Sequence, residues 1–373
     1  MHIDIDTAVY SGQTRGGISR MFNEILPRMC DIDPTLNINL LVYNNPVQPL
    51  PKHSCIRTKN LIPKDNTALQ DRLWKFMKQV FSIKSNNYLD SSNYGNIWHS
   101  TYYTLPNDKY VAQIVTVHDM IYERFTQVFY GSGSDEFREI KKKCILNADA
   151  IICVSETTKT DLLNFYNLPE SIVQVIHQGY SNEFKSTSIS NNRLRENPFL
   201  LYVGSRASYK GVDILFQAYS QWSNNNNVEL VVIGEEWSKE EMENLKYLKI
   251  YDKVCLLNNI DDKVLAKLYL KALAFIYPSL YEGFGIPLLE AMASGCPIIA
   301  SRIPSTVEVA GDCPIYFEPA RVDDLIRSLN LVIDEGKESD RIRLGFQHVK
   351  KYSWDATASQ TLKVYRTVNE LTK

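Results

Sequence analysis

The sequence predicts an α/β fold of two domains, each built on a parallel β-sheet. Its 373 residues, divided by about 150 per domain, give roughly 2.5 domains. Short continuous runs of Val, Ile and Leu alternate with stretches of helical periodicity, a pattern typical of βαβ units whose strands are covered on both faces. The polar stretch 185–192 lacks periodicity and suits a linker. We therefore expect domains at 1–186 and 187–352.

The second half carries the clearer alternation. The expected strands are 199–203, 228–233, 254–257, 274–277 and 297–300, and the expected helices are 212–222, 239–248, 262–271 and 287–293. These strands are continuously apolar, so they predict a buried parallel sheet with helices on both faces, as in a Rossmann-like domain.

The first half repeats this pattern less regularly. Its expected strands are 3–9, 38–43, 114–117 and 150–154, and its expected helices are 19–29, 136–147 and 156–166. Ser19 and Ser155 are expected to cap the first and the last of these helices, because a serine hydroxyl accepts a hydrogen bond from an unpaired helical amide. Ser353 is expected to cap a final helix at 354–371 in the same way.

Composition excludes several classes of function. The 41 Lys and Arg nearly balance the 43 Asp and Glu, so the net charge of −2 provides no field that would gather nucleic acid. No apolar run approaches the length of about 18 residues that a membrane-spanning helix needs, and the acidic start does not fit a signal peptide, so we expect a cytoplasmic protein. The 7 cysteines and 6 histidines form no Cys-x-x-Cys or His-Glu-x-x-His pattern, so neither disulfides nor a metal site are predicted.

The most specific motif runs from Glu282 to Glu290. Gly283 and Gly285 form a turn after a buried strand, and Pro287 begins the following helix. Glycines let the backbone approach a ligand closely, and a helix amino end favours an anion, so a phosphate or diphosphate site is expected here. The two carboxylates would flank it as acceptors for hydroxyl groups. A turn with two solvated glutamates is the competing interpretation, which the spacing disfavours.

Three further features join this motif. Arg206 and Lys210 lie in a loop between a strand and a helix, where their cations can stabilise a departing nucleoside diphosphate without a metal. Gly17 follows the first strand in a Gly-Gly pair, but no Gly-x-Gly-x-x-Gly is present, which disfavours a dinucleotide dehydrogenase. His118 comes directly after a strand. Each feature alone also fits a structural role, as a solvated loop, a turn or a buried histidine.

Together these residues resemble the E-x7-E motif and its companions in the retaining family 4 glycosyltransferases. The matching segments follow the family's order, and they are Gly16-Gly17-Ile18-Ser19-Arg20, Val117-His118-Asp119, Val154-Ser155-Glu156-Thr157-Thr158, Gly204-Ser205-Arg206 with Lys210-Gly211, and 278–295. The resemblance implies the GT-B fold, in which two Rossmann-like domains face each other and the C-terminal helix, 353–373 here, crosses back to the first. In many relatives the arginine directly follows the glycine, whereas here Ser205 intervenes.

The resemblance also implies roles for the site residues. It places Glu290 on the donor ribose, Lys210 and Arg206 on the diphosphate, and Glu282 with the amides near Phe284, Gly285 and Ile286 on the sugar. The first domain would supply Gly17, His118 and the acceptor, with His118 approaching the donor sugar. No metal and no cofactor are implied, and the leaving diphosphate oxygen accepts the acceptor's proton.

Two shorter stretches of the sequence imply which donor is used. The stretches 116–122 and 202–206 look most like those of mannosyltransferases that act on surface polysaccharides, which implies GDP-mannose as donor and a glycan or lipid-linked acceptor. A UDP-glucose or UDP-galactose transferase is the alternative. A sugar-nucleotide epimerase or phosphorylase of the same fold and a non-catalytic GT-B partner subunit also stay open.

Two stretches suggest further contacts. The segment 71–84 is predominantly basic, contains Trp74 and has apolar residues at helical spacing. Such a helix suits peripheral binding to the inner face of an anionic membrane, and it fits a helix docked on its own domain equally well. Tyr102 and Tyr103 are candidates for an acceptor groove, because aromatic rings pack against sugars.

Overall fold

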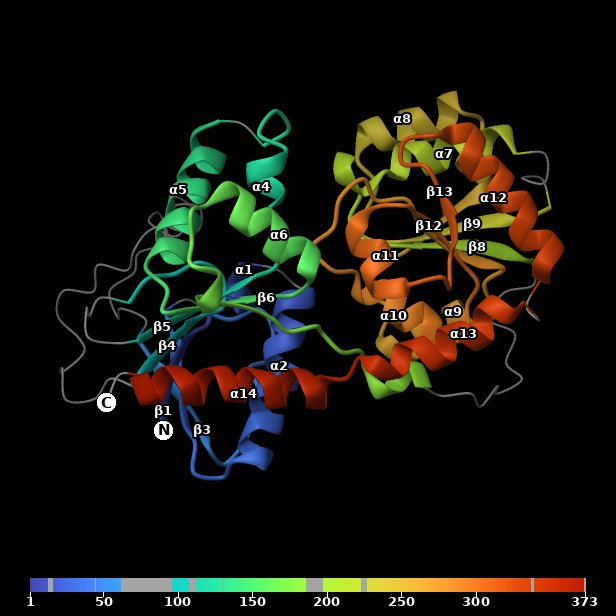
Figure 1. Cartoon of the computed structure of the whole chain (residues 1–373). Coiled ribbons are helices and arrows are strands. Elements are labelled where there is room, and N and C mark those ends of the chain that lie inside the picture. Colours follow the sequence, from blue (N-terminus) through green and yellow to red (C-terminus); the bar gives the residue numbers. More distant parts are fainter. Residues whose placement is uncertain are drawn as a thin grey trace. The chain divides into compact units, whose positions relative to one another are not determined.

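The computed structural model describes residues 1–12, 16–43, 45–61, 96–106, 112–129, 131–185, 197–222, 227–336 and 339–371. The contacts divide the chain into two compact units, which are Met1–Gly179 with Ser353–Lys373, and Tyr180–Tyr352. Figure 1 traces both units. The segment 71–84 and residues 186–192 of the predicted linker lie outside the described residues.

The second unit begins earlier than residue 187. The short helix η3 (Asn182–Lys185) already belongs to it. Phe184 in this helix is fully buried, and its ring packs edge-on against Tyr269 with centroids 6.0 Å apart. This packing is part of the second unit, so that unit includes Lys185, the first residue of the polar stretch.

In the described part of the first unit, seven parallel strands form a sheet in the order β3-β2-β1-β4-β5-β6-β7. The strands are β1 (His2–Asp6), β2 (Asn37–Val42), β3 (Ile56–Asn60), β4 (Ile97–Ser100), β5 (Ala112–Val117), β6 (Ala150–Cys153) and β7 (Val173–Val175). The helices are α1 (Ala8–Gly12), α2 (Gly17–Ile32), α4 (Ile121–Arg124), α5 (Ser132–Leu146), α6 (Glu156–Phe165) and the short η2 (Glu170–Ile172). Alternate side chains of β5 face opposite sides of the sheet, so Val115 and Val117 pack in the core under α5 and α6.

The last helix, α14 (Trp354–Leu371), packs against α2 in the first unit, which confirms the predicted return of the C-terminal helix. Ser353 caps it as predicted, since its Oγ accepts the amide proton of Ala356 at 3.1 Å. Beneath the helix, the Tyr365 hydroxyl hydrogen-bonds His99 Nδ1, and His99 Nε2 lies 2.9 Å from Thr116 Oγ1. A satisfied buried polar network therefore fixes α14 on the sheet.

The buried His99 makes the stability of this unit depend on pH. Burial lowers the pKa of His99 from 6.5 to about 3, and the nearby His118 adds to the effect. The unfolded chain binds a proton near pH 6.5 that the folded chain does not bind until about pH 3, so stability falls as the pH falls between these values. We expect His99 to contribute a loss on the order of 3 kcal/mol between pH 7 and pH 4. The unfolding free energy of His99→Gln should then vary less with pH than that of the wild type, and identical profiles would contradict this assignment.

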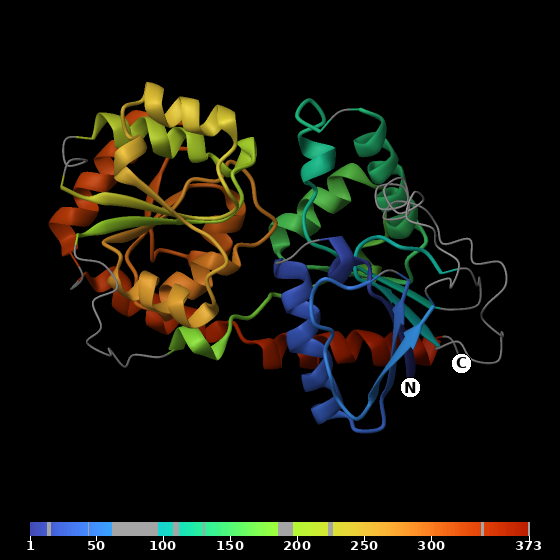
Figure 2. The ribbon, with the colours of Figure 1, turned by 180° about the vertical axis from the view of Figure 1, so that it is seen from behind.

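In the described part of the second unit, six parallel strands form a sheet in the order β10-β9-β8-β11-β12-β13. The strands are β8 (Phe199–Val203), β9 (Glu229–Ile233), β10 (Val254–Leu257), β11 (Ala274–Tyr277), β12 (Ile298–Ser301) and β13 (Ile315–Phe317). The α-helices are α7 (Val212–Gln221), α8 (Lys239–Tyr247), α9 (Asp262–Lys271), α10 (Ile286–Ala293), α11 (Pro304–Ala310), α12 (Val322–Glu335) and α13 (Asp340–His348), and the 3₁₀ turns are η4 (Ser208–Lys210), η5 (Tyr251–Lys253) and η7 (Val349–Lys351). Helices α7, α8 and α12 cover one face, and α9 and α10 cover the other (Figure 2). This arrangement confirms the predicted Rossmann-like, doubly covered sheet.

Two local predictions in the first unit are wrong. The first strand ends at Asp6 and not at residue 9, because the buried Asp6 carboxylate accepts the amide protons of Ala8 and Thr101, each at 2.7 Å, and turns the chain into α1. Ser19 does not cap α2, which begins at Gly17 with Gly16 as N-cap, and the Ser19 hydroxyl instead donates to the Gly16 carbonyl at 3.0 Å.

Several short elements were not predicted from the sequence. Strand β3 has the sequence Ile-Arg-Thr-Lys-Asn at the edge of its sheet, where no continuous apolar run is needed, and β7 and β13 have 3 residues each. Helices α11 to α13 complete the second unit after the last predicted strand. Among the described helices, none has the length and apolar character required to cross a bilayer.

Candidate functional site

Two loops meet at the carboxyl edge of the second unit's sheet, where parallel α/β sheets bind their ligands. One follows β8 and contains Lys210, and the other follows the paired strand β11 and contains Glu282. Lys210 Nζ lies 2.7 Å and 2.9 Å from the two carboxylate oxygens of Glu282. Ser279 Oγ also donates to Glu282 Oε1 at 2.6 Å. The fold therefore joins two predicted site residues that lie 72 positions apart in the sequence.

Gly211 allows these two loops to approach each other. Its φ is +66°, and a Cβ at this position would lie 2.1 Å from the carbonyl oxygen of Pro278. A backbone hydrogen bond lies beside this contact, from the Leu280 amide to the Tyr209 carbonyl at 2.7 Å. Only glycine fits both this backbone conformation and this space. This geometry explains why glycine follows Lys210 in the motif.

The glycine-rich turn leads into α10 as predicted. Gly285 is the N-cap with φ +125°, a conformation that other residues rarely adopt, and Pro287 lies in the first helical turn. The side chain of Phe284 is buried and packs 5.9 Å from the ring of Tyr352, which anchors the turn. The amino end of α10, beginning at Ile286, carries the positive end of the helix dipole and suits an anion.

Both glutamates of the motif interact with a buried tyrosine. Glu290 is only 3% exposed, and the Tyr269 hydroxyl donates to its Oε2 at 3.3 Å. Burial, reinforced by the nearby Glu282 carboxylate, raises the pKa of Tyr277, the last residue of β11, well above its usual value, so its hydroxyl keeps its proton. Neither tyrosine was predicted from the sequence, although Tyr277 ends the predicted strand directly before the motif.

Arg206 is engaged away from the Lys210–Glu282 pair. Its Nε donates to Glu241 Oε1 at 2.6 Å and its Nη2 to Oε2 at 3.1 Å, while the guanidinium lies 4.5 Å from the ring centroid of Trp237. A Cβ at Gly234 would lie 2.7 Å from Arg206 Nη1, so this glycine makes room for the guanidinium. Among the described residues Nη1 is buried without a hydrogen-bond partner. The predicted diphosphate contact would therefore use Nη1 or replace Glu241.

In the first unit, His118 directly follows β5 at the carboxyl edge of the sheet. Burial lowers its pKa from 6.5 to about 4, with Asp119 opposing and Lys141 adding to the effect, so the imidazole is neutral at pH 7. Within the described part of the chain, the buried Nε2 has no hydrogen-bond partner. Buried polar atoms are rarely left unpaired, so His118 is the strongest candidate for a ligand contact in this unit.

The positions of the other residues predicted in the first unit are explained by local structure. Gly17 is the exposed first residue of α2. Ser155 caps α6 as predicted, since its Oγ accepts the Thr158 amide proton at 2.9 Å. The prediction that Tyr103 lines an acceptor groove is wrong, because Tyr103 is buried in the core. Its ring centroid lies 5.7 Å from that of Phe137.

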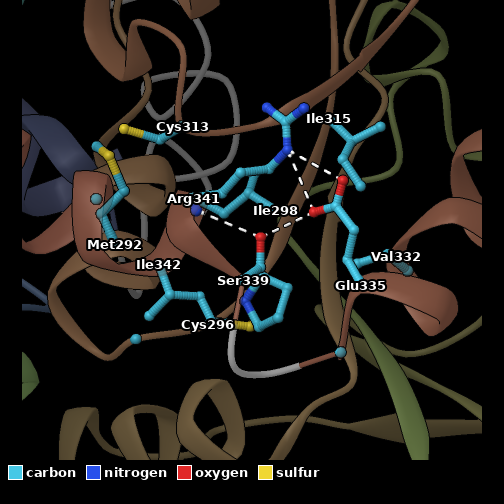
Figure 3. A pocket seen from close by; sticks show the side chains of 14 residues that line it. Met292, Cys296, Ile298, Cys313, Ile315, Val332, Glu335, Ser339, Arg341 and Ile342 are labelled. Carbon is cyan, nitrogen blue, oxygen red and sulfur yellow. Dashed lines mark hydrogen bonds and ion pairs between the residues drawn. The ribbon is translucent and has the colours of Figure 1, made fainter.

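Figure 3 shows a pocket in the second unit whose lining includes Met292 at the end of α10 but neither Lys210 nor Glu282. Its lining includes Ile298 and Ile315, which are the first residues of β12 and β13. Beside them, Glu335 accepts a hydrogen bond from Ser339 at 2.8 Å and pairs with Arg341 at 3.3 Å. Because the strands begin here, this is the amino edge of the sheet, opposite to the carboxyl edge that carries Lys210. The pocket is therefore separate from the candidate site.

Two glycosyltransferase family models match adjoining parts of the chain. The model "Glycosyl transferases group 1" matches residues 184–344, and the model "Glycosyltransferase Family 4" matches residues 86–184. The O-antigen chain mannosyltransferase RfbU of Salmonella typhimurium is 31% identical over 224 residues, which cover 59% of this chain and 60% of that protein. The chain spans about 60% of the length of the curated relatives that it matches first.

Two solved structures share the fold over nearly the whole chain. WaaG, a glycosyltransferase involved in lipopolysaccharide biosynthesis, matches with a TM-score of 0.74 at 15% identity, covering 97% of this chain and 99% of its own. Anabaena HepE in complex with UDP and glucose matches with a TM-score of 0.70 at 16% identity, covering 98% of this chain and 99% of its own. The two family models adjoin along the sequence, and both structural matches confirm the fold. The chain therefore matches glycosyltransferase family models over residues 86–344 and has the GT-B fold.

Proposed function

We propose that this chain transfers a hexose from a nucleoside diphosphate sugar to a glycan or lipid-linked acceptor in the synthesis of a surface polysaccharide. The observation that supports this most is the Lys210–Glu282 pair at the carboxyl edge of the second sheet, beside the amino end of α10. A cation and a helix amino end suit a diphosphate, and carboxylates suit the hydroxyl groups of a sugar.

The cations are proposed to act on the leaving group. Lys210 neutralises the charge that develops on the diphosphate as the bond to the sugar breaks. Arg206 contributes through Nη1, or by exchanging its bonds to Glu241 for phosphate oxygens, because a guanidinium binds phosphate and carboxylate with the same geometry.

The carboxylates and amides are proposed to hold the rest of the donor. Glu290 binds the ribose hydroxyls, and Glu282 exchanges its bonds to Lys210 for bonds to sugar hydroxyls. The backbone amides near Phe284, Gly285 and Ile286 lie at the amino end of α10 and bind the same sugar. Gly17 is proposed to contact the donor from the amino end of α2.

We propose a retaining reaction that requires no metal. The bond between the anomeric carbon and the diphosphate oxygen breaks while the acceptor hydroxyl oxygen bonds to the same face of the sugar. The acceptor's proton passes to the leaving diphosphate oxygen. Lys210 supplies the charge stabilisation for which other enzymes of this chemistry use a metal ion.

The proposed donor is GDP-mannose. RfbU, which is 31% identical over 224 residues, is an O-antigen chain mannosyltransferase. A UDP-hexose is the alternative, since HepE shares the fold and was solved with UDP and glucose.

A direct assay tests this proposal. The full chain is incubated with GDP-mannose, UDP-glucose or UDP-galactose and a lipid-linked saccharide, with and without EDTA, and the product linkage is determined by NMR. We expect transfer from GDP-mannose that EDTA does not reduce, with the anomeric configuration of the donor kept. Transfer from a UDP-hexose alone would overturn the donor, inversion would overturn the mechanism, and an absolute need for a divalent cation would overturn metal independence.

His118→Ala is expected to lower kcat/KM for transfer by roughly 10- to 100-fold, the effect of losing one hydrogen bond to the donor sugar. The imidazole is neutral, and its unpaired Nε2 is proposed to bond a sugar hydroxyl. The matched control is His2→Ala, which removes an exposed histidine from the same sheet. Equal transfer rates in the two variants would remove His118 from the site.

A further inference from the structure

The first unit contains a second cluster of chemically active side chains, which the proposed transfer does not use. Cys30, His53 and Cys55 each place a ligand atom within 4.8 Å of the other two. Cys30 is buried in the last turns of α2, and the other two are half-buried in the segment before β3. The sequence predicts no metal site here, because these residues are spread over two segments and form no Cys-x-x-Cys pair.

The distances suit a small tetrahedral cation. With bonds of about 2.3 Å to sulfur and about 2.0 Å to nitrogen, ligand atoms around zinc lie about 3.3 to 3.8 Å apart. Atoms at the observed upper limit of 4.8 Å therefore need a contraction of about 1.0 to 1.5 Å. Because His53 and Cys55 are half-buried, side-chain rotation at the surface can supply it.

The surroundings of His53 match those of a metal-binding histidine. Its Nε2 lies 3.3 Å from Asp31 Oδ1, the kind of carboxylate contact that orients a liganding imidazole and leaves the other nitrogen to the metal. That other nitrogen, Nδ1, now accepts the Cys55 amide proton at 3.1 Å, and it would exchange this bond for the ion.

We propose that Cys30, His53 and Cys55 bind a thiophilic divalent cation, Zn²⁺ being the best fit. Two thiolates and an imidazole favour zinc over the harder Mg²⁺ and Ca²⁺. Both thiols lose their protons to solvent on binding, and solvent supplies the fourth ligand. The ion would link the end of α2 to the chain just before the edge strand β3, and none of its three protein ligands takes part in the proposed sugar transfer.

The test is a titration of the reduced, chelator-stripped full chain with Zn²⁺ and with Co²⁺. We expect one equivalent of Co²⁺ to give the intense visible absorption of a tetrahedral cobalt–thiolate site, Zn²⁺ to displace it, and the melting temperature to rise with Zn²⁺ concentration. Cys55→Ser and His53→Gln, both at half-buried positions, should abolish the absorption while melting like the metal-free wild type. Asp31→Asn should weaken binding by roughly 10- to 100-fold.

The control is Cys255→Ser, which alters a half-buried thiol in the second unit and should bind like the wild type. The proposal is overturned if the wild type gives no thiolate absorption, or if Cys55→Ser binds as tightly as Cys255→Ser. A Cys30–Cys55 disulfide that persists under reductant would overturn it as well.

Discussion

Lys210→Ala is expected to reduce hexose transfer by about 10³-fold or more while the second unit stays folded. The Lys210 ammonium lies at the carboxyl edge of the sheet, 2.7 Å from a carboxylate oxygen of Glu282. Its loss removes the stabilisation of the departing diphosphate, and that interaction is strongest in the transition state. The measurement is kcat/KM for transfer, together with the melting temperature of the variant.

Lys263→Ala is the matched control, because Lys263 is exposed on α9 of the same unit. It should transfer like the wild type. Glu282→Gln removes the other member of the pair without changing its size, and it should also reduce transfer strongly. If both Lys210→Ala and Glu282→Gln transfer at rates near that of Lys263→Ala, the candidate site is wrong.

Gly211→Ala is expected to destabilise the second unit by about 3 kcal/mol or more and to abolish transfer. An alanine at φ +66° costs about 1 to 2 kcal/mol for the backbone alone. Its Cβ would also meet the Pro278 carbonyl oxygen at 2.1 Å, so the two loops must separate. That separation moves Lys210 away from Glu282, which links the loss of stability to the loss of activity.

Gly336 provides the control for this variant. Its φ is also positive, +63°, but its ψ is −166° where that of Gly211 is 20°, and a Cβ there would meet nothing within 4 Å. Gly336→Ala therefore carries a backbone cost of its own, because glycine alone adopts that region readily, but it moves neither loop of the candidate site and should keep full activity. Urea unfolding and transfer rates are measured for both variants. If Gly211→Ala keeps full activity as well, the approach of the two loops is not what requires glycine at position 211.

The sequence predicted the second unit well because its strands are continuous apolar runs that a buried parallel sheet requires. Strand β10 and helix α9 have the expected bounds. Edge strand β3 was missed because half-exposed residues at a sheet edge need no apolar run. Ser19 was misjudged as a cap because serine also donates to backbone carbonyls, as it does here to Gly16.

The residues of the candidate site could be predicted from the sequence, but the pairs that they form could not. Gly211 and Gly285 have positive φ values, which glycine adopts more readily than other residues. Glycines at these two positions could therefore be singled out in the sequence. That Lys210 binds Glu282 whereas Arg206 binds Glu241 depends on the contact of separate loops, which local patterns do not encode. The cluster of Cys30, His53 and Cys55 was hidden for the same reason, since a helix end and a distant segment meet only in the folded unit.

Calorimetric titration of the full chain with GDP-mannose, repeated with Lys210→Ala, tests the central claim most directly. We predict that the wild type binds one equivalent of GDP-mannose, that GDP competes for the same site, and that Lys210→Ala binds at least 10-fold more weakly. Equal affinity of the wild type and Lys210→Ala would contradict the claim that the edge of the second sheet holds the diphosphate, and binding of no nucleotide sugar at all would contradict the proposed function.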